Sequence, residues 1–264
     1  MGIVNVTPDS FADGGLHAQA RAAIDRCEQL VRDGADILDI GGESTRPGAS
    51  EVGAANELTR VLPVLREAVK LGVPVSVDTS EPRVMHEALA LGVDIVNDVR
   101  SLRRPGALAQ LAAHPRAGVC VMHMRGEPDS MQLQTDYADC VTEVSRFLED
   151  RARQLEQAGI GRERIVVDPG IGFAKLAAHN IQILARQHEL LRLPWPLLVG
   201  WSRKGTLGHI TGRAVEQRLA ASVAAALAAV QRGAAIVRVH DVADTVDALK
   251  VWQAAGLLTP QANQ

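Results

Sequence analysis

The sequence predicts an α/β protein in which eight strand–helix units close into a single barrel. An apolar run repeatedly follows a glycine that ends a helical segment, as at Gly34 and Gly72. Glycine ends helices because it adopts the left-handed conformation without a Cβ penalty. The runs are continuously apolar, which is typical of strands covered on both faces in a parallel sheet. No long linker divides the chain, so we expect one domain, residues 1–264, with a (β/α)8 TIM-barrel fold.

Eight apolar runs account for the eight strands. In chain order they lie at 2–6, 36–40, 72–78, 92–98, 118–124, 164–168, 197–201 and 233–239. Amphipathic helices are expected between them, and Ser80, two residues before a proline, predicts one helix start. In the helix before the last strand, one helical face carries the apolar residues Leu219, Val223, Ala226 and Val230.

An open, doubly wound sheet is the alternative α/β fold. Such a sheet usually carries a G-x-G-x-x-G turn directly after its first strand. Here the first strand runs instead into the segment NVTPDSF. The barrel is therefore favoured.

Composition excludes several partners. The net charge is −3 and aromatic residues make up 3% of the chain, so we expect neither a nucleic-acid nor a membrane partner. Cys27, Cys120 and Cys140 form no C-x-x-C pair, which argues against a disulfide framework or a zinc site and suits a reducing cytoplasm. No apolar run reaches the roughly 20 residues needed to cross a membrane, and the first residues lack a signal-peptide pattern.

Polar residues stand at the end of every expected strand, where this fold builds its active sites. Acceptors and an amide come from Asp78, Asn97 and Asp168. Positive charge and donors come from a second set: Arg46, Arg203, Lys204, Arg238 and His240. A ligand with an edge of N–H donors and a phosphate tail satisfies both sets. His123 also ends a strand, but its role is left open between site and structure.

The loops after the first two strands, TPDSFADGG and GGESTRPGAS, are rich in Gly, Pro, Ser and Asp. This composition is typical of tight turns. It is equally compatible with two mobile lids that order over a substrate.

Successive blocks of the chain resemble the signature segments of the dihydropteroate synthases, in family order from Met1 to Asp241. The blocks are MGIVNVTPDSFADGG, DIGGESTRPGA, VSVDTSEP, VNDV, VMHMRGEPDSMQ, DPGIGFAK, SRKGTLG and RVHDV. The resemblance implies a cytoplasmic enzyme of folate biosynthesis and a target of sulfonamides. It also implies a homodimer formed through the later helices.

The resemblance also implies roles for individual residues. The pterin is bound by Asp78, Asn97, Met122, Asp168, Lys204 and Arg238. The pyrophosphate is bound by Asn5, Arg46, Arg238 and His240, with Asn5 acting partly through Mg²⁺ as cofactor. The p-aminobenzoate pocket contains Thr45, Arg46, Pro47, Phe173, Ser202 and Arg203, and the first loop closes over it with Asp9, Phe11 and Asp13. The catalytic set is Asp78, Asp168, Lys204 and Arg238.

The chain departs from the family pattern at Ala12, Ala174 and Gly205, which stand where relatives have a hydroxyl residue, a glycine and a hydroxyl residue. It also starts directly at the first expected strand, where relatives usually carry a short extension. These departures concern the lid and the aminobenzoate pocket more than the pterin site.

The implied reaction joins the amine of p-aminobenzoate to the methylene of 6-hydroxymethyl-7,8-dihydropterin pyrophosphate. It would proceed by leaving-group stabilisation without a covalent enzyme intermediate. The alternatives are a pterin-binding methyltransferase domain that serves a corrinoid protein, a Schiff-base aldolase acting through Lys204, and a non-catalytic pterin-binding relative. The cationic set and the STRPG and SRK blocks favour the synthase.

Overall fold

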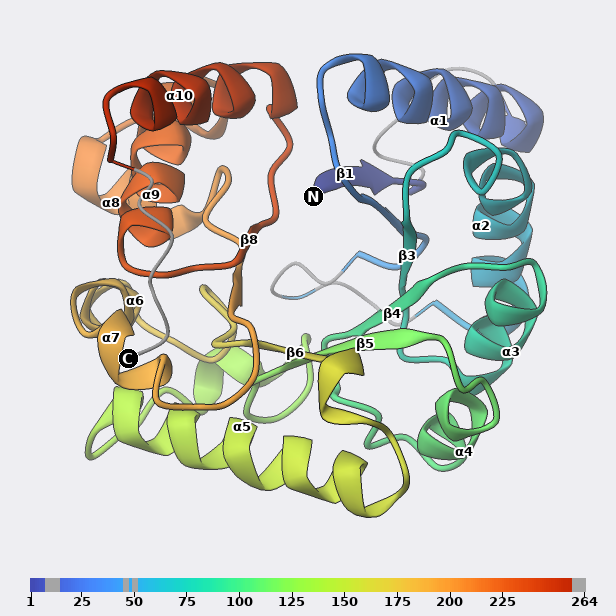
Figure 1. The fold of residues 1–264 in the computed structure, drawn as a ribbon, viewed down its shortest axis with the longest axis horizontal. Coiled ribbons are helices and arrows are strands. Elements are labelled where there is room, and N and C mark those ends of the chain that lie inside the picture. Colours follow the sequence, from blue (N-terminus) through green and yellow to red (C-terminus); the bar gives the residue numbers. More distant parts are fainter. Residues whose placement is uncertain (8–14, 45–47, 49–51, 258–264) are drawn as a thin grey trace.

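The computed structural model describes residues 1–7, 15–44, 48 and 52–257. Its strands are all parallel and follow one another around a ring (Figure 1). Their bounds are β1 Gly2–Asn5, β2 Leu38–Gly41, β3 Val75–Asp78, β4 Ile95–Asp98, β5 Gly118–Met122, β6 Ile165–Asp168, β7 Leu198–Val199 and β8 Ile236–Val237. Every strand predicted from the sequence is present.

Two single bridges close the ring. Strands β1 to β6 form one continuous sheet and β7 pairs with β8. Val167 bridges Leu197, and Gly2 bridges Val239, so β6 meets β7 and β8 meets β1. The last closure carries hydrogen bonds from Ile3 N to Val239 O at 3.0 Å and from Val239 N to Met1 O at 2.9 Å. The predicted (β/α)8 barrel is confirmed.

The last two strands are shorter than predicted. β8 ends at Val237, so the placement of Arg238 and His240 within that strand is wrong. Both residues flank Val239, whose backbone bridges β1 instead of continuing the ladder with β7. Strand five likewise ends at Met122, one residue before His123. Strand ends depend on hydrogen bonds to neighbouring strands, which local apolar runs do not encode.

Helices surround the barrel and connect the strands (Figure 1). In chain order they are α1 Gly15–Arg32, α2 Ala54–Ala68, α3 Pro82–Ala90, α4 Ala107–Ala112, α5 Cys140–Gln157, α6 Ala177–Ala185, α7 Gln187–Leu190, α8 Gly205–Thr211, α9 Leu219–Gln231 and α10 Val242–Ala254. Short 3₁₀ turns lie at Met131–Leu133, Arg162–Arg164 and Val215–Gln217. α3 begins with Pro82 as predicted, but Ser80 does not cap it, because its hydroxyl binds Asp98 instead.

The buried face of α9 differs from the predicted one. Ser222, Ala225, Ala226 and Ala229 are buried, whereas Leu219 is 39% exposed. Small side chains let this helix approach β8 closely, and Ser222 Oγ is drawn inward by the backbone N–H of Arg203 at 2.9 Å. Of the four residues predicted to share the packed face, only Ala226 is buried, so the packed face of α9 is only partly the predicted one.

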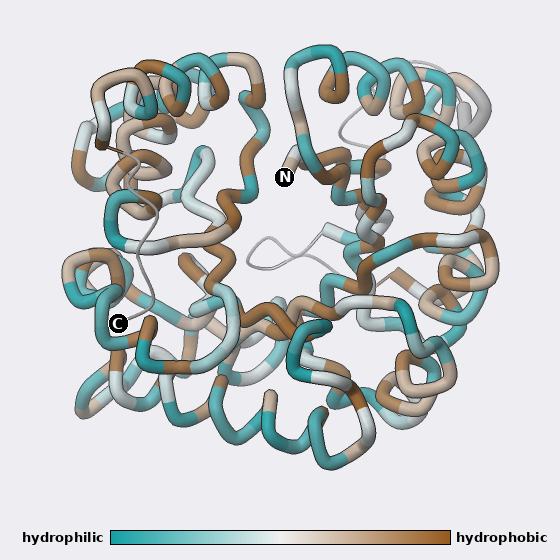
Figure 2. The backbone as a smooth tube through the Cα atoms, in the orientation of Figure 1, coloured by the Kyte–Doolittle hydropathy of each residue, from teal (hydrophilic) through white to brown (hydrophobic). Residues whose placement is uncertain are grey.

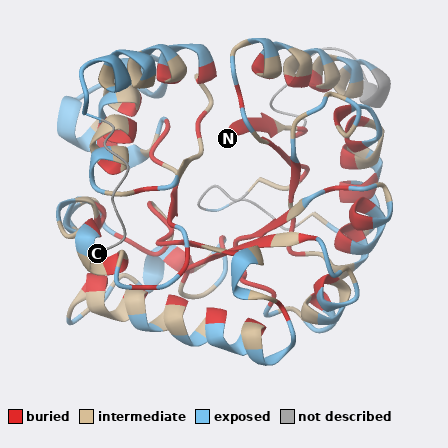
Figure 3. Cartoon of the chain, in the orientation of Figure 1, coloured by how far each residue is buried: buried red, intermediate tan, exposed pale blue. Residues whose placement is uncertain are grey.

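The strands consist largely of apolar residues (Figure 2), and most of these residues are buried (Figure 3), although both residues of β8 are only partly buried. One large core cluster runs from β1 to α10 between barrel and helices. Burial on both faces explains why these strands read as continuous apolar runs. Among the described residues, no helix is long and apolar enough to cross a membrane.

Candidate active site at the carboxyl ends of the strands

The strand register brings predicted site residues to one rim. Asn5 pairs with Gly41, Gly41 with Asp78, and Asp78 with Asn97, which places them in one row across β1 to β4. At Gly41 a Cβ would lie 3.2 Å from Cβ of Asp78, so the absence of a side chain there leaves room for this carboxylate. Across the rim, Met122 pairs with Asp168.

Arg238 lies between two carboxylates. Its Nε donates to Asp39 Oδ2 at 2.5 Å and its Nη2 donates to Asp78 Oδ2 at 2.8 Å. Asn97 Nδ2 donates to the same Asp39 oxygen at 3.1 Å. Asp39 is fully buried in β2 and thus joins a residue of β4 to one after β8. The sequence analysis missed Asp39, although a carboxylate inside the apolar run ILDIGG was a signal for it.

Burial and charge act against each other in this group. Burial raises the pKa of Asp78, and the neighbouring Arg238 opposes that rise. Burial also disfavours the Arg238 cation, but Asp39 and Asp78 outweigh it and raise the pKa of the guanidinium above its ordinary value. Arg238 is therefore a fixed positive charge at the rim. Paired charges of this kind are tolerated in a low-dielectric site because each satisfies the other.

A second group gathers around Asp168 on β6. Its Oδ1 accepts the backbone N–H of Gly170 at 2.7 Å. Burial raises the pKa of Asp168, opposed by the Gly170 N–H and by Lys204. Nζ of Lys204 lies 4.4 Å from the centre of the Phe173 ring, within cation–π range. Burial lowers the pKa of Lys204 to about 8, opposed by Asp168, so at neutral pH this lysine stays mostly charged.

Met122 lies beside this group. It is 3% exposed and packs with Val99, Ala174 and Phe173 in a small apolar cluster. Ser101 fixes its backbone, since Ser101 Oγ donates to Met122 O at 2.6 Å and accepts from Met122 N at 2.9 Å. The rim thus has an apolar wall next to the Asp168 carboxylate.

His240 and Ser202 form a third group. Ser202 Oγ accepts from His240 N at 3.2 Å and lies 2.9 Å from His240 Nδ1. Burial lowers the pKa of His240 to about 4, with Arg203 and Arg238 adding to the effect. If Ser202 donates to Nδ1, Nε2 of the neutral ring carries the proton and acts as a donor.

Arg203 is held away from the other cations. Its guanidinium binds Asp241 through two hydrogen bonds of 3.1 and 2.5 Å, and it is about half exposed. Its backbone has a φ of 59°, a left-handed conformation that is uncommon for a residue with a Cβ. Its part in an aminobenzoate pocket stays a prediction.

His123 is buried behind the rim and contacts a lysine that the sequence analysis did not single out. Nζ of Lys175 lies 2.9 Å from His123 Nδ1. Burial, with Lys175 adding to it, lowers the pKa of His123 to about 2, so the imidazole is neutral. His123 therefore belongs to the framework of the site. The only signal for Lys175 was its place at the end of the DPGIGFAK block.

Several predicted residues lie outside the described residues. They are Asp9, Phe11 and Asp13 of the first loop and Thr45, Arg46 and Pro47 of the second. Ala12 belongs with them. Among the residues that are described, no group of three or more His, Cys, Asp or Glu side chains gathers as a metal site.

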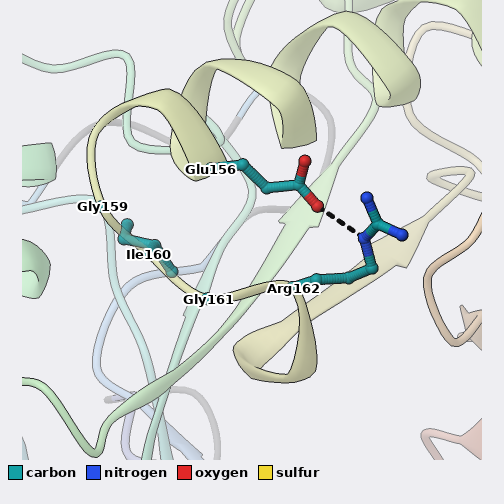
Figure 4. Close-up of a pocket in the computed structure, with 5 residues that line it drawn as sticks. All are labelled: Glu156, Gly159, Ile160, Gly161 and Arg162. Carbon is teal, nitrogen blue, oxygen red and sulfur yellow. Dashed lines mark hydrogen bonds and ion pairs between the residues drawn. The ribbon is translucent and has the colours of Figure 1, made fainter.

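A shallow hollow lies at the other end of the barrel. It is lined by Glu156 and by Gly159 to Arg162, where α5 leads into β6 (Figure 4). Glu156 and Arg162 pair across it at 2.8 Å. This is the amino-terminal end of β6, away from Asp168. In this fold that end contributes to stability more than to catalysis.

The barrel rim places acidic and amide side chains beside cationic ones, an arrangement typical of enzymes that bind a polar ring with an anionic tail. Comparison with known proteins identifies the class of enzyme. The family model described as pterin binding enzyme matches residues 1–240. Dihydropteroate synthase of Neisseria meningitidis serogroup B is 52% identical over 263 residues, covering 97% of this chain and 92% of that protein. The enzyme of Escherichia coli K12 is 47% identical over 255 residues, covering 96% and 90%.

Solved structures agree with these relatives. Xanthomonas albilineans dihydropteroate synthase with 4-aminobenzoic acid superposes with a TM-score of 0.92 at 51% identity, covering 98% of this chain and 93% of that one. The same enzyme in complex with 7,8-dihydropteroate gives a TM-score of 0.89 at 48% identity, covering 98% and 94%. The chain belongs to the pterin binding enzymes and, within them, to the dihydropteroate synthases.

Proposed function

We propose that this chain condenses 6-hydroxymethyl-7,8-dihydropterin pyrophosphate with p-aminobenzoate, forming 7,8-dihydropteroate and releasing pyrophosphate. The observation that carries the proposal is the pairing of two chemically different groups on one rim. Asp78, Asn97 and Asp168 offer acceptors and an amide, while Arg238 and His240 offer a cation and a neutral donor. The similar Xanthomonas albilineans dihydropteroate synthase has been solved with 4-aminobenzoic acid and with 7,8-dihydropteroate.

The pterin would lie between the first two groups. A carboxylate that accepts two parallel N–H bonds suits the amidine-like edge of a pterin ring, and Asp168 is the buried carboxylate available for it. Met122 would contact one face of the ring and Arg238 would cover the other. Lys204 and Asn97 would read the remaining polar edge.

The pyrophosphate would lie toward Arg238, His240 and Asn5. His240 binds as a neutral donor at first, and the phosphate charge then favours its protonation. Mg²⁺ fits here only together with substrate oxygens, because Asn5 offers a single hard oxygen ligand and the described residues hold no group of three or more His, Cys, Asp or Glu side chains placed to bind a metal. Bound with the diphosphate, Mg²⁺ would neutralise charge on the leaving group.

The chemistry requires positioning more than a strong base. An arylamine is a weak nucleophile, so the protein's main contribution is to stabilise the departing pyrophosphate and to align the two substrates. Arg238 is suited to the first task because Asp39 and Asp78 fix its orientation. Asp168 stabilises positive charge that develops on the pterin methylene. No side chain forms a covalent intermediate.

The p-aminobenzoate pocket would be formed by Phe173, Ser202 and Arg203 on this side of the rim. Phe173 packs beneath Lys204 and beside the proposed pterin site, so it could meet the arene as well as the pterin. The two early loops would complete the pocket through Thr45, Arg46 and Pro47 and close it through Asp9, Phe11 and Asp13.

Two variants test the assignment. Asp168→Asn should weaken pterin binding at least about tenfold, because a charged hydrogen bond contributes roughly 1.5–3 kcal/mol. Arg238→Ala should lower turnover and pyrophosphate affinity together. Calorimetry with each ligand and a p-aminobenzoate-dependent assay of pyrophosphate release measure these effects. Asp247→Asn, an exposed change on α10, is the control.

The outcomes separate the alternatives. Unchanged pterin affinity in Asp168→Asn would remove that residue from the site, and an effect of Arg238→Ala on p-aminobenzoate alone would contradict the phosphate assignment. A wild-type chain that releases no pyrophosphate would point to the methyltransferase or non-catalytic reading. An imine trapped by borohydride on Lys204 would identify an aldolase.

We also propose that the protein is one pterin-binding domain that forms a cytoplasmic homodimer. The exposed apolar residues Ile181 on α6, Ile210 on α8 and Leu219 on α9 lie on the later helices and supply a surface for a second copy. The three cysteines are buried and free, in keeping with a reducing compartment. Sedimentation of wild type and Ile210→Glu tests the dimer, since a charge in that surface should release monomers.

A further inference from the structure

Lys175 is a buried lysine that the proposed chemistry does not use. It is 4% exposed, and no carboxylate of the described residues lies within ion-pair distance of it. Its Nζ instead lies 2.9 Å from His123 Nδ1, 3.0 Å from Gly170 O, 3.0 Å from Phe173 O and 3.3 Å from His123 O. Four acceptors surround a group with three hydrogens. A buried amine is costly unless such bonds replace its water.

Two of these acceptors, Gly170 O and Phe173 O, belong to the turn that joins β6 to α6, and the other two belong to His123, which follows β5. The turn begins at Asp168 and ends at Lys175, so the lysine reaches back into the loop that precedes it. Gly170, whose carbonyl binds Nζ, also donates its N–H to Asp168 Oδ1. Phe173, whose carbonyl binds Nζ, lies beneath Lys204. The Lys175 ammonium therefore binds the backbone next to Asp168, in the proposed pterin site, and the backbone of Phe173, in the proposed aminobenzoate pocket.

Three residues of the turn have a left-handed backbone, and one of them carries a Cβ. Gly170 and Gly172 have φ values of 69° and 83°, and Ala174 has a φ of 51°. A left-handed conformation costs a residue with a Cβ roughly 1–2 kcal/mol. Other side chains bind two further carbonyls of the turn, with Gln132 Nε2 on Gly172 O at 3.1 Å and Tyr137 OH on Ala174 O at 3.0 Å. Side chains thus fix the shape of the turn from outside.

We propose that Lys175 is a positioning residue for the condensation: its ammonium fixes the β6–α6 turn, and through it the places of Asp168 for the pterin and Phe173 for the aminobenzoate. The inference rests on the proposed function only through the roles of those two residues. Lys175 itself touches neither substrate. His123 is its buried partner, which gives this histidine, one residue beyond the end of β5, a structural role in the site.

The protonation states agree with this geometry. Burial lowers the pKa of Lys175 to about 7, with Asp168 among the groups that oppose the shift and Lys204 and Arg125 among those that add to it. His123 is neutral, so Nδ1 accepts when the lysine is protonated. Below pH 7 the lysine is mostly an ammonium, and its three hydrogens are then available to the acceptors around it.

Kinetics of three variants test the proposal. Lys175→Met nearly keeps the length of the side chain but removes every hydrogen-bond donor. Lys175→Gln keeps two N–H donors, those of the amide. Tyr137→Phe is the matched control, because it removes a hydrogen bond to the same turn at Ala174 O without touching the carbonyls of Gly170 or Phe173. Thermal unfolding verifies that each variant is folded.

We expect KM for both substrates to rise about tenfold or more in Lys175→Met and by less in Lys175→Gln, while Tyr137→Phe stays within about twofold of wild type. A folded Lys175→Met with wild-type KM for both substrates overturns the proposal. So does a loss in Tyr137→Phe as large as in Lys175→Met, because the effect would then belong to the stability of the turn alone. Failure of the proposed function is distinguishable from failure of the Lys175 proposal, because in the former case the wild-type protein itself would release no pyrophosphate.

A measurement on the wild-type protein covers the case in which the variants do not fold. The chain has four lysines, Lys70, Lys175, Lys204 and Lys250, so side-chain ¹⁵N NMR spectra are simple. At pH 6 the Nζ hydrogens of Lys175 should exchange slowly, whereas those of Lys70 and Lys250, which are exposed, exchange rapidly. Exchange of Lys175 as fast as that of Lys70 would show that the turn is not held as proposed.

Discussion

At the residue scale, the site depends on buried charged side chains that do not face the substrate. Asp39 is fully buried, and one of its oxygens accepts from both Arg238 and Asn97. Its other oxygen has no hydrogen-bond partner among the described residues. A carboxylate in that position is costly, and its bonds hold Arg238 and Asn97, two residues of the proposed pterin site.

Asp39→Asn should therefore raise KM for the pterin pyrophosphate by roughly tenfold or more, because the ion pair with Arg238 is replaced by a weaker hydrogen bond from the guanidinium to a neutral amide. KM for p-aminobenzoate should change little. Steady-state kinetics with each substrate varied in turn measure the split. Asp36→Asn, an exposed change two residues before β2, is the control and should behave as wild type. Equal losses for both substrates in Asp39→Asn would indicate general damage to the barrel.

At the element scale, short connections decide where the strand-terminal side chains point. The β6–α6 turn passes under Lys204 and closes against the end of β5. At Gly170 a Cβ would lie 2.1 Å from the carbonyl oxygen of His123, closer than any real contact. Strand patterns predict that such a turn exists, but not that it packs against the neighbouring strand.

Gly170→Ala should lower the free energy of unfolding by more than the roughly 1–2 kcal/mol of a left-handed alanine, because the methyl group also displaces the His123 carbonyl. It should weaken pterin binding too, since Gly170 N–H supports Asp168. Gly159→Ala is the matched control. It has a φ of 89° but no atom within 4 Å of the new Cβ, and it lies at the opposite end of the barrel. Urea unfolding and pterin calorimetry compare the two, and equal costs would contradict the packing argument.

At the scale of the whole molecule, the barrel brings eight strand ends into one low-dielectric region, and this shifts the protonation of its histidines. The folded-state pKa of His240 is about 4, below the ordinary value of 6.5. The unfolded chain therefore binds more protons between those values, so this histidine makes the fold more stable as pH rises from about 4 to 6.5. Buried carboxyls with raised pKa values, such as Asp168, act in the opposite direction.

Comparison of variants isolates the histidine contribution. The stability difference between wild type and His240→Gln should change with pH by up to about 1.4 kcal/mol per pH unit between pH 4 and 6.5, and should be flat above pH 7. Urea unfolding across that range measures it. His209→Gln, which replaces an exposed histidine on α8, is the control variant. A flat difference for His240→Gln would mean that the ring is solvated in the folded protein.

The sequence by itself determined the alternation of strands and helices, because a continuous apolar run that follows a helix-ending glycine is typical of a buried parallel strand. It also determined that Asp78, Asn97 and Asp168 end strands and must meet at one rim of a parallel barrel. It mispredicted the packed face of α9, where a hydroxyl and small side chains lie inward. The sequence pattern also placed Arg238 and His240 within β8, because the bridge from Val239 to β1 depends on a long-range contact that no local pattern encodes.

Only the tertiary structure decided how the site is held. Asp39 and Arg238 are 199 positions apart, and Lys175 and His123 are 52 apart, so no local pattern relates them. Their pairing depends on the closure of the barrel, which removes water from around them and makes each polar contact matter more. The residues at the strand ends could be predicted from the sequence, whereas the buried groups that orient them could be identified only from the tertiary structure.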